Sequence, residues 1–442
     1  MKDDSDDRRS MRPFFTLWIG QAISLIGSQL VQFALIWWMT QQTGSATVLA
    51  TASIAGILPQ VFLGPFVGVM VDRWNRRWTM LGADFVVALA TLVLALLFWS
   101  GSVELWHIYV VLFIRSLGGA FHWPAMTAST SLMVPADQLT RIQGLNQILN
   151  GGLNIASAPL GALLVSLLPV EGVMMIDLAT AAVAMLAVLL TQIPQPAPRV
   201  AADPGQSTLA AFTSDLRAGL RYLLDWRGLL LLSIVAMLLN LVLAPTTSFM
   251  PLLVTEIFKG TAWHLGALEA GFAIGILVGG LLLSVWGGFR RRIYTSVLGV
   301  AGIGLGILLV GVAPVSAFSL VVVGMLLSGV MSSLANGPIM AIFQAHIEPG
   351  MQGRVLTLLN SMSMGMMPIG LALAGPLADV VGVRAWFVVG GLFTLLLAVA
   401  CLFIPSVMNI EEHGARVSEE PVAVPAAGTP AAAATDSYPA QL

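Results

Sequence analysis

The sequence predicts an all-α membrane protein with twelve transmembrane helices, arranged as two parallel six-helix repeats. Hydrophobic residues make up 57% of the 442 residues and charged residues only 10%. A soluble domain of this size could not bury so much apolar surface. The apolar sequence divides into segments of membrane length, and the two halves of the chain share motifs at a constant offset. The short alternating segments of a transmembrane β-barrel do not occur in the sequence.

The predicted spans are continuous apolar segments, because about 20 apolar residues are needed to cross a bilayer. Prolines within them, such as Pro124 and Pro159, are tolerable where neighbouring helices satisfy the freed backbone groups. The twelve segments are residues 14–38, 46–71, 78–99, 105–128, 142–168, 172–193, 228–254, 266–287, 293–313, 316–341, 355–378 and 384–405.

Positive charge is distributed asymmetrically among the segments that connect these spans. All lysines and arginines except Lys259, Arg384 and Arg115 lie in the N-terminal segment, the even-to-odd connections or the C-terminal tail. We expect the protein to lie in the inner (plasma) membrane. By the positive-inside rule, both termini are expected on the cytoplasmic side. The N-terminal segment is acidic and then basic, so we expect no cleaved signal peptide. A single cysteine, Cys401, excludes an internal disulfide framework.

The apolar pattern is interrupted once, from Pro194 onward, by a proline-rich and then amphipathic stretch. The tail is rich in Ala, Pro and Glu, a composition that favours disorder. We therefore expect an N-terminal six-helix bundle, a cytoplasmic linker with an amphipathic helix over 209–226, a C-terminal six-helix bundle and a disordered cytoplasmic tail, at residues 1–195, 196–227, 228–405 and 406–442.

The two halves align when the chain is shifted by 214 residues, the separation of Arg76 from Arg290. Six spans per half is an even number, so the repeats insert with the same orientation. The N-terminal half alone keeps two charges, because Asp72 falls on Trp286 and Arg115 on Gly329. The shared motifs are Arg76-Arg77 with Arg290-Arg291, Pro124 with Pro338, Met126 with Met340, Pro135 with Pro349, and Arg141 one residue from Arg354.

The loop between the second and third spans resembles the signature of the major facilitator superfamily. The residues that match are Gly68, Asp72, Arg73, Arg76 and Arg77. The resemblance implies that they form a conformational latch between the two halves in the outward-facing state. The alternative is that the basic residues only fix topology.

The family usually has glycine where this chain has Asn75. Since Asn tolerates a left-handed turn better than most residues, we expect the turn to be kept.

Arg115 lies in the middle of the fourth span, where a charged group costs at least ~2.5 kcal/mol. It must therefore face a cavity or a partner. The stretch resembles the proton-antiporter motif of drug exporters, with Gly119 four residues later, although Gly118 stands where that motif often has Gln. The resemblance implies that Arg115 couples proton movement to transport. The alternative is a structural ion pair between helices.

Two carboxylates, Asp84 and Asp177, are candidates for the partner of Arg115 or for the proton carrier. Burial disfavours the charged form of a carboxyl, so either could hold a proton at neutral pH. For Asp84 the alternative, which we favour, is a fixed salt bridge near the loop. We expect His122, in the fourth span, to be a packed polar group rather than a proton relay.

Polar residues form a stripe along the first span, with spacings of three, four and four that place them on one helical face: Gln21, Ser24, Ser28 and Gln32. Such groups face protein or water in a bilayer. They are therefore a candidate wall of the substrate cavity, with hydrogen bonding between helices as the alternative. A second stripe, Asn146, Asn150 and Asn154, favours hydrogen bonding between helices.

The chain as a whole resembles the macrolide-efflux branch of the drug–proton antiporters, over residues 14–405. The stretches that carry this resemblance are 18–26, Gly82-Ala83-Asp84, 112–116 and Pro368-Ile369-Gly370. It implies export of macrolides or other amphipathic drugs by proton antiport with alternating access. The alternatives are a siderophore or metabolite exporter, or a lysolipid flippase without proton coupling.

The sequence holds no P-loop, metal-ligand cluster or nucleophile triad, so we expect neither an enzyme nor a bound cofactor or metal. The partners that we expect are an amphipathic small molecule, protons and the lipid bilayer. We expect no nucleic-acid partner and a monomeric protein.

Overall fold

The structure is a computed structural model that describes residues 11–195 and 208–412 of the chain. Within these ranges the surroundings of a few helical residues, among them Gly68, Asp72 and Arg73, lie outside the description. Every regular element in the described ranges is helical.

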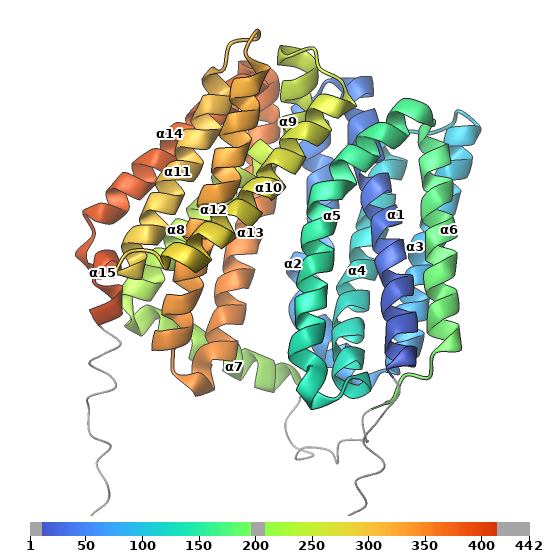
Figure 1. Cartoon of the computed structure of the whole chain (residues 1–442), viewed down its shortest axis with the longest axis horizontal. Coiled ribbons are helices and arrows are strands. Elements are labelled where there is room, and N and C mark those ends of the chain that lie inside the picture. Colours follow the sequence, from blue (N-terminus) through green and yellow to red (C-terminus); the bar gives the residue numbers. More distant parts are fainter. Residues whose placement is uncertain (1–10, 196–207, 413–442) are drawn as a thin grey trace, which may run out of the picture.

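The N-terminal half is a bundle of six long helices, at the right in Figure 1. A short turn of helix, η1 (Ala136–Gln138), leads into the fifth. The six are α1 (Arg12–Thr43), α2 (Ala46–Arg73), α3 (Arg76–Trp99), α4 (Leu105–Met133), α5 (Leu139–Leu167) and α6 (Val170–Leu190).

The C-terminal half repeats this arrangement after the linker helix α7 (Thr208–Asp225), which lies across one end of the molecule (Figure 1). Short helical segments, α9 (Met250–Leu252) and η2 (Leu253–Ile257), extend the first helix of this half. Its long helices are α8 (Arg227–Ser248), α10 (Ala262–Trp286), α11 (Arg292–Val312), α12 (Phe318–His346), α13 (Pro349–Val381) and α14 (Val383–Leu402).

Eleven of the described helices are long and apolar enough to cross a membrane. The remaining predicted span coincides with α4, which is more polar because it carries Arg115, His107 and His122. The protein is thus a multi-pass membrane protein, and the predicted fold class of twelve helices in two six-helix repeats is confirmed.

The first residues of the predicted disordered tail are described in the structure and are partly helical. A short helix, α15 (Pro405–Met408), follows α14, and the side chains of Val407 and Ile410 are buried at 0% and 1% exposure. These residues join a hydrophobic cluster with the ends of α8 and α11, so apolar packing holds the start of the segment. Residues 413–442 of the predicted tail lie outside the described residues.

The two halves meet at one end of the molecule, which we call the far end because α1 reaches it at Thr43. The opposite end, which holds Arg12 and α7, is called the terminal end. The most extensive contacts across the boundary between the halves are those of α2 with α13 and of α5 with α10. Ser53 Oγ of α2 lies 2.7 Å from Ser248 Oγ of α8.

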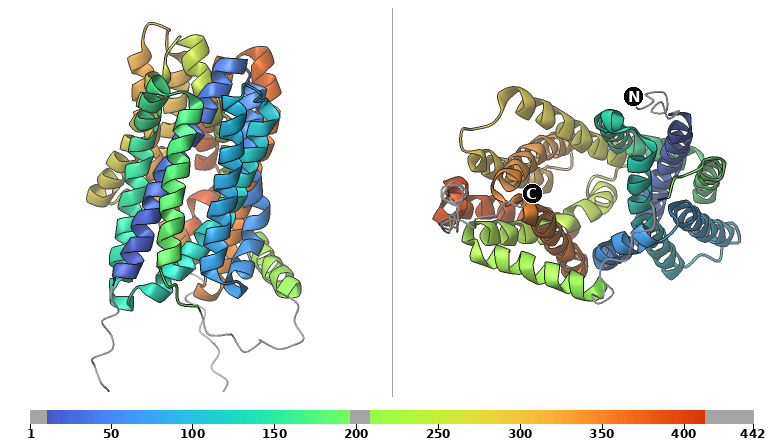
Figure 2. Two further views of the ribbon diagram at one scale, coloured as in Figure 1. Left: turned by 90° about the vertical axis from the view of Figure 1, so that its right-hand side faces the viewer. Right: turned by 90° about the horizontal axis from the view of Figure 1, so that it is seen from below.

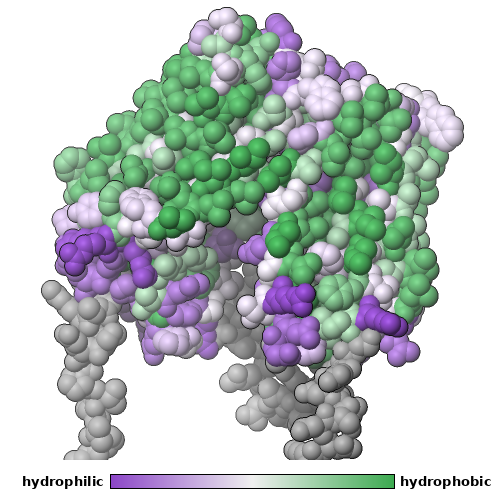
Figure 3. All heavy atoms as spheres, in the orientation of Figure 1, coloured by the Kyte–Doolittle hydropathy of each residue, from purple (hydrophilic) through white to green (hydrophobic). Residues whose placement is uncertain are grey.

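Between the halves the surface is hollowed, and the hollow opens toward the terminal end (Figure 3). Figure 2 shows the two groups of helices side by side when viewed from that end, with α7 along one edge. The molecule is therefore closed at the far end and open at the terminal end.

Candidate functional site

A cavity of about 470 Å³ lies in the N-terminal half, between α1, α2, α3, α4 and α6. All four residues of the stripe on α1, Gln21, Ser24, Ser28 and Gln32, line it. The 3.6-residue repeat of the helix brings them onto one face, and that face looks into the cavity rather than toward lipid. Arg115, Asp177 and Asp84 line the same cavity, so seven of the predicted site residues lie around one space.

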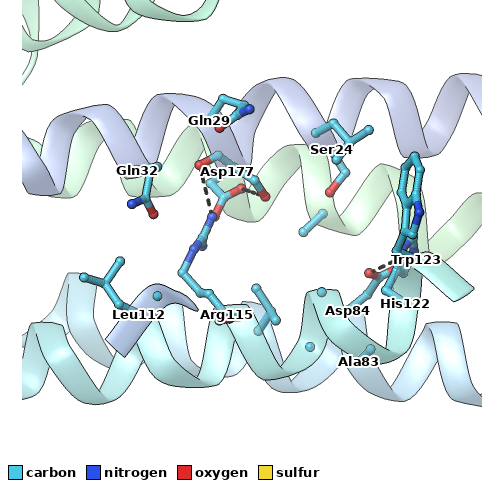
Figure 4. Close-up of a pocket in the computed structure, with 18 of the residues that line it drawn as sticks. Ser24, Gln29, Gln32, Ala83, Asp84, Leu112, Arg115, His122, Trp123 and Asp177 are labelled. Carbon is cyan, nitrogen blue, oxygen red and sulfur yellow. Dashed lines mark hydrogen bonds and ion pairs between the residues drawn. The ribbon is translucent and has the colours of Figure 1, made fainter. Parts of the chain in front are cut away.

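Arg115 and Asp177 form a close ion pair in the wall of this cavity (Figure 4). Arg115 Nη1 lies 2.6 Å from Asp177 Oδ2, and the side chains are 9% and 4% exposed. Arg115 Nη1 also donates to Thr91 Oγ1 at 2.7 Å, and Nη2 donates to the carbonyl oxygen of Ser28 at 3.2 Å. Ser28 Oγ donates to Asp177 Oδ1 at 3.2 Å. Of the two candidate carboxylates, Asp177 is therefore the partner of Arg115.

Asp84 lies in the half of α3 that is nearer the terminal end, and its partners differ from those of Asp177 (Figure 4). Its Oδ2 accepts a hydrogen bond from Gln21 Nε2 at 3.2 Å, and its Oδ1 lies 3.5 Å from His122 Nε2. We predicted a fixed salt bridge near the loop for Asp84 and simple packing for His122. The structure brings the two side chains together in the cavity wall, where they form an ion pair when His122 is protonated, with 14% and 17% of their side chains exposed.

The two polar clusters are stacked along one face of α4. Arg115 and His122 are seven residues apart, so two helical turns, or about 10 Å, separate them. Gly118 lies between them against α3, where a Cβ atom would be 2.4 Å from Val87 Cγ2. A glutamine, which the antiporter motif often has at this position, would not fit that contact.

Several residues that line this cavity were not predicted from the sequence. Gln29 and Gln60 line it, and Thr91 helps to hold Arg115. Gln60 and Thr91 are single polar residues in apolar stretches, so the signal available was their position within a span. Gln29 follows Ser28 directly, which places it off the predicted stripe.

A second cavity, of about 420 Å³, lies in the C-terminal half. Its wall contains apolar residues from α8, α11, α12, α13 and α14 but no charged residue among those described. The polar residues that line it are Ser233, Asn240, Ser296, Ser332, Asn336, Asn360 and Ser363. The charged residues that line the two cavities therefore all lie in the N-terminal half, whereas uncharged polar groups line both cavities.

The arginines of the signature loop make contacts within the N-terminal half. Arg76 Nη1 donates to the carbonyl oxygen of Ala128 in α4 at 2.9 Å, and its side chain is buried. Arg77 donates to the carbonyl oxygens of Val188 and Leu189 at the end of α6. The surroundings of Gly68 and the side chains of Asp72 and Arg73 lie outside the description, so the latch itself stays a prediction.

The expected left-handed turn at Asn75 is wrong. Asn75 has φ −68° and ψ 110°, which is extended backbone. Its side-chain oxygen accepts hydrogen bonds from the amides of Arg77 and Trp78 at 3.1 and 3.3 Å. Asn75 is thus the N-cap of α3, a role that Asn fills without a positive φ.

Of the second predicted polar stripe, Asn146 joins two helices: its Oδ1 accepts a hydrogen bond from Trp18 Nε1 of α1 at 2.7 Å. This is the contact between helices that the stripe on α5 predicted.

Comparisons with known proteins agree on one family. The sequence profile of the Major Facilitator Superfamily matches residues 17–371. Macrolide efflux protein A of Streptococcus pyogenes is 37% identical over 398 residues, which cover 90% of this chain and 97% of that protein. The multidrug efflux pump Tap of Mycolicibacterium fortuitum is 26% identical over 399 residues, or 87% of this chain and 94% of the pump.

Solved structures of low sequence identity share the fold. The nucleoside transporter NupG superposes with a TM-score of 0.68 at 15% identity, covering 88% of this chain and 98% of its own. A bacterial homologue of the human lysosomal transporter Spinster, in an inward-facing conformation, gives a TM-score of 0.66 at 13% identity, with 92% and 98% covered. This chain is therefore a membrane transporter that belongs to the major facilitator superfamily and resembles its macrolide efflux proteins over most of its length.

Proposed function

We propose that the protein exports macrolides or other amphipathic small molecules from the cytoplasm, by proton antiport with alternating access. The observation that carries the proposal is a buried ion pair, Arg115–Asp177, in the wall of a cavity in the N-terminal half of a protein whose two halves contact each other at the far end. A charge within a membrane is costly. It is retained where it serves transport or proton movement, and the similarity to efflux proteins supports that role.

The open, terminal end faces the cytoplasm in this proposal. The arginines of the signature loop lie at that end, as does Arg141, and the positive-inside rule places such residues in the cytoplasm of a bacterial inner membrane. Substrate then enters the hollow from the cytoplasm or from the inner leaflet. The far end must open, and the terminal end close, for release on the other side.

The two cavities suit an amphipathic ligand. Each has a volume within the range of about 300–1,000 Å³ that is common for ligand sites. The wall in the N-terminal half offers charged and amide groups, including the stripe on α1, and the wall in the C-terminal half offers apolar surface with scattered amides and hydroxyls. A molecule with a polar and an apolar face could contact both walls.

Proton coupling resides, in this proposal, in Arg115, Asp177 and Asp84. The signature residues Gly68, Asp72, Arg73, Arg76 and Arg77 form the latch that closes the terminal end. Asp72→Asn is then expected to impair transport and leave topology unchanged, and normal transport by this variant would remove the latch from the proposal.

The test is uptake of ethidium or a macrolide into inverted membrane vesicles, with and without a proton gradient. We expect accumulation that depends on the gradient and collapses when a protonophore is added. Vesicles without the protein are the control. If an amphipathic compound or lysolipid is transported independently of the proton gradient, the protein is an uncoupled flippase. If no amphipathic compound is transported, the proposal is refuted.

A further inference from the structure

We propose that the coupling proton is held by the pair Asp84–His122, and that Arg115 and Asp177 stay ionised throughout the cycle. This inference rests on the proton antiport proposed above, and it names the residues that load and unload. In this proposal one group carries the proton and another balances the charge of Arg115, whereas a single buried carboxylate would have to do both.

Both carboxylate oxygens of Asp177 have partners in the structure. Arg115 donates a hydrogen bond to Oδ2 at 2.6 Å, and the hydroxyl of Ser28 donates one to Oδ1 at 3.2 Å, so both oxygens already accept hydrogen bonds. The guanidinium of Arg115 does not release its own proton. A proton on Asp177 would therefore leave a buried positive charge without its balancing partner, which is strongly unfavourable.

Asp84 has no such fixed cation. Among the described residues its ion-pair partner is His122, whose Nε2 lies 3.5 Å from Asp84 Oδ1 and which is charged only when protonated. Imidazole is the side chain that exchanges a proton near neutral pH. One proton on the pair makes it neutral, and loss of that proton leaves one negative charge. Because the two groups interact, the titration belongs to the pair and not to either residue.

The charged and titratable groups around this pair are few. Arg115 and His122 come from α4 and Asp177 from α6, whereas α1 and α2 contribute the neutral amides Gln21 and Gln60. Arg115 is two helical turns away from His122 and is engaged by Asp177. The pair is therefore the one place in this cavity, among the described residues, where a proton can be added without breaking an existing salt bridge.

Part of each side chain of the pair is exposed in this conformation, although the Nε2 atom of His122 is buried. The two side chains are 14% and 17% exposed, against 4% for Asp177. The cavity that they line lies within the N-terminal half, and the surface between the halves is hollowed toward the terminal end (Figure 3). A proton that arrives from the far side when that end is open can thus leave to the cytoplasm in the state seen here.

This arrangement gives a physical reason for obligatory exchange. When both ends close, the cavity loses water, and an uncompensated negative charge is costly to dehydrate. A transporter whose pair is deprotonated can pass through the closed state only when bound substrate covers the pair. The empty carrier can return only when a proton has neutralised the pair. Substrate and proton therefore move in opposite directions, and the proton passes from external water to the pair and on to cytoplasmic water.

The experiment compares two assays on purified protein in liposomes. The first measures accumulation of ethidium driven by a proton gradient, and the second measures exchange of ethidium across preloaded vesicles without a gradient. Asp84→Asn mimics a permanently neutral side chain. We expect it to lose driven accumulation while exchange and downhill flux continue. Asp177→Asn should lose both activities, and Asp137→Asn, at an exposed carboxylate outside the cavity, should keep both.

His122→Gln provides a second variant that keeps the carboxylate. We expect it to shift the pH range of driven accumulation and to preserve exchange; an unchanged pH profile would remove His122 from the pair. If Asp84→Asn does not fold, as judged by size-exclusion chromatography, His122→Gln decides the question alone.

The outcomes separate this inference from the function on which it rests. If the parent protein shows no gradient-driven transport, the proposed antiport fails. If the parent is driven by the gradient and Asp84→Asn accumulates ethidium equally well, only the inference fails. Loss of driven accumulation with intact exchange in Asp177→Asn would also overturn it, and would make Asp177 the carrier.

Discussion

Single arginines in this protein are held by groups that only a folded bundle can supply. Arg115 reaches a carboxylate, a hydroxyl and a carbonyl oxygen that come from three other helices. The planar guanidinium suits this because its donors point in several fixed directions. A lysine at this position could not make the same set of contacts.

Removing one member of the pair should destabilise the protein. Asp177→Asn leaves the guanidinium of Arg115 buried without a counter-charge, and breaking such a pair costs about 3–5 kcal/mol in the free energy of unfolding. We expect a clear fall in the thermal unfolding temperature in detergent.

The double variant Arg115→Met with Asp177→Leu is the control, because apolar residues of similar size often replace a buried pair at little cost. It should recover much of the stability and lack coupled transport. An Asp177→Asn variant that unfolds at the parent temperature would contradict the burial of the pair.

At the scale of the helices, several ends are satisfied by side chains from other segments. Arg77 donates to the last turn of α6, and Arg384 donates to the carbonyl oxygens of Gly311 and Ala313 at the end of α11, at 2.7 Å each. A cation at a helix C-terminus also complements the helix dipole. This contact explains why Arg384 departs from the charge asymmetry of the loops.

The start of α3 depends on Asn75. Asn75→Ala removes an acceptor for two backbone amides, and the loss of an N-cap costs about 0.5–2 kcal/mol. Asn75→Asp should keep the cap and most of the stability. Thermal unfolding of the three proteins is the measurement. A glycine variant more stable than the parent would indicate the left-handed turn that the structure lacks.

Helices α10 and α12 approach each other through glycines. A Cβ on Gly279 would lie 2.3 Å from the carbonyl oxygen of Val330, whereas a Cβ on Gly280, its neighbour, would meet nothing within 4 Å. Close approach of this kind is typical of helix packing in membranes.

These two glycines form a matched pair for mutation. Gly279→Ala should lower the unfolding temperature, since overpacking costs about 1–3 kcal/mol. Gly280→Ala should be neutral or stabilising by up to about 1 kcal/mol, because alanine favours the helix. Equal effects of the two substitutions would contradict the orientation of α10.

The whole molecule is held closed at its far end by contacts across the two halves. Asp379 of α13 accepts hydrogen bonds from the hydroxyl of Ser45 and the backbone amides of Ala46 and Thr47, at 3.0, 2.6 and 3.1 Å. A carboxylate of one half thus caps the first turn of α2 in the other half. Gly375 allows this closeness, since a Cβ there would lie 3.0 Å from Thr47 Cα.

Asp379→Ala should weaken this closure and shift the population toward a state open at the far end. Cys401 is the chain's one cysteine and is 3% exposed, so introduced cysteines can be labelled selectively. Spin-label distances should lengthen between the halves at the far end and shorten at the terminal end. Asp137→Ala, at the exposed terminal end, should leave both distances unchanged, and an unaltered distribution in Asp379→Ala would show that the cap does not control closure.

The sequence by itself determined the spans, the two halves and the need for a partner at Arg115. Hydropathy is a local property, since each membrane-spanning segment must be apolar enough to lie in the bilayer, whatever its neighbours are. The polar stripe on α1 could be predicted in the same way, because helical periodicity places Gln21 and Ser28 on one face before any packing is known.

Only the tertiary structure decided which groups meet across helices. Asp84 and Asp177 are equally reasonable partners of Arg115 in the sequence, and His122 carries no sign of its pairing with Asp84. These choices depend on how far each helix is rotated and shifted against the next. Close contacts scattered along the chain, such as Gly118 against Val87, set that rotation. No local pattern holds this information, which is why the ion pair and the Asp84–His122 pair became visible only in the folded bundle.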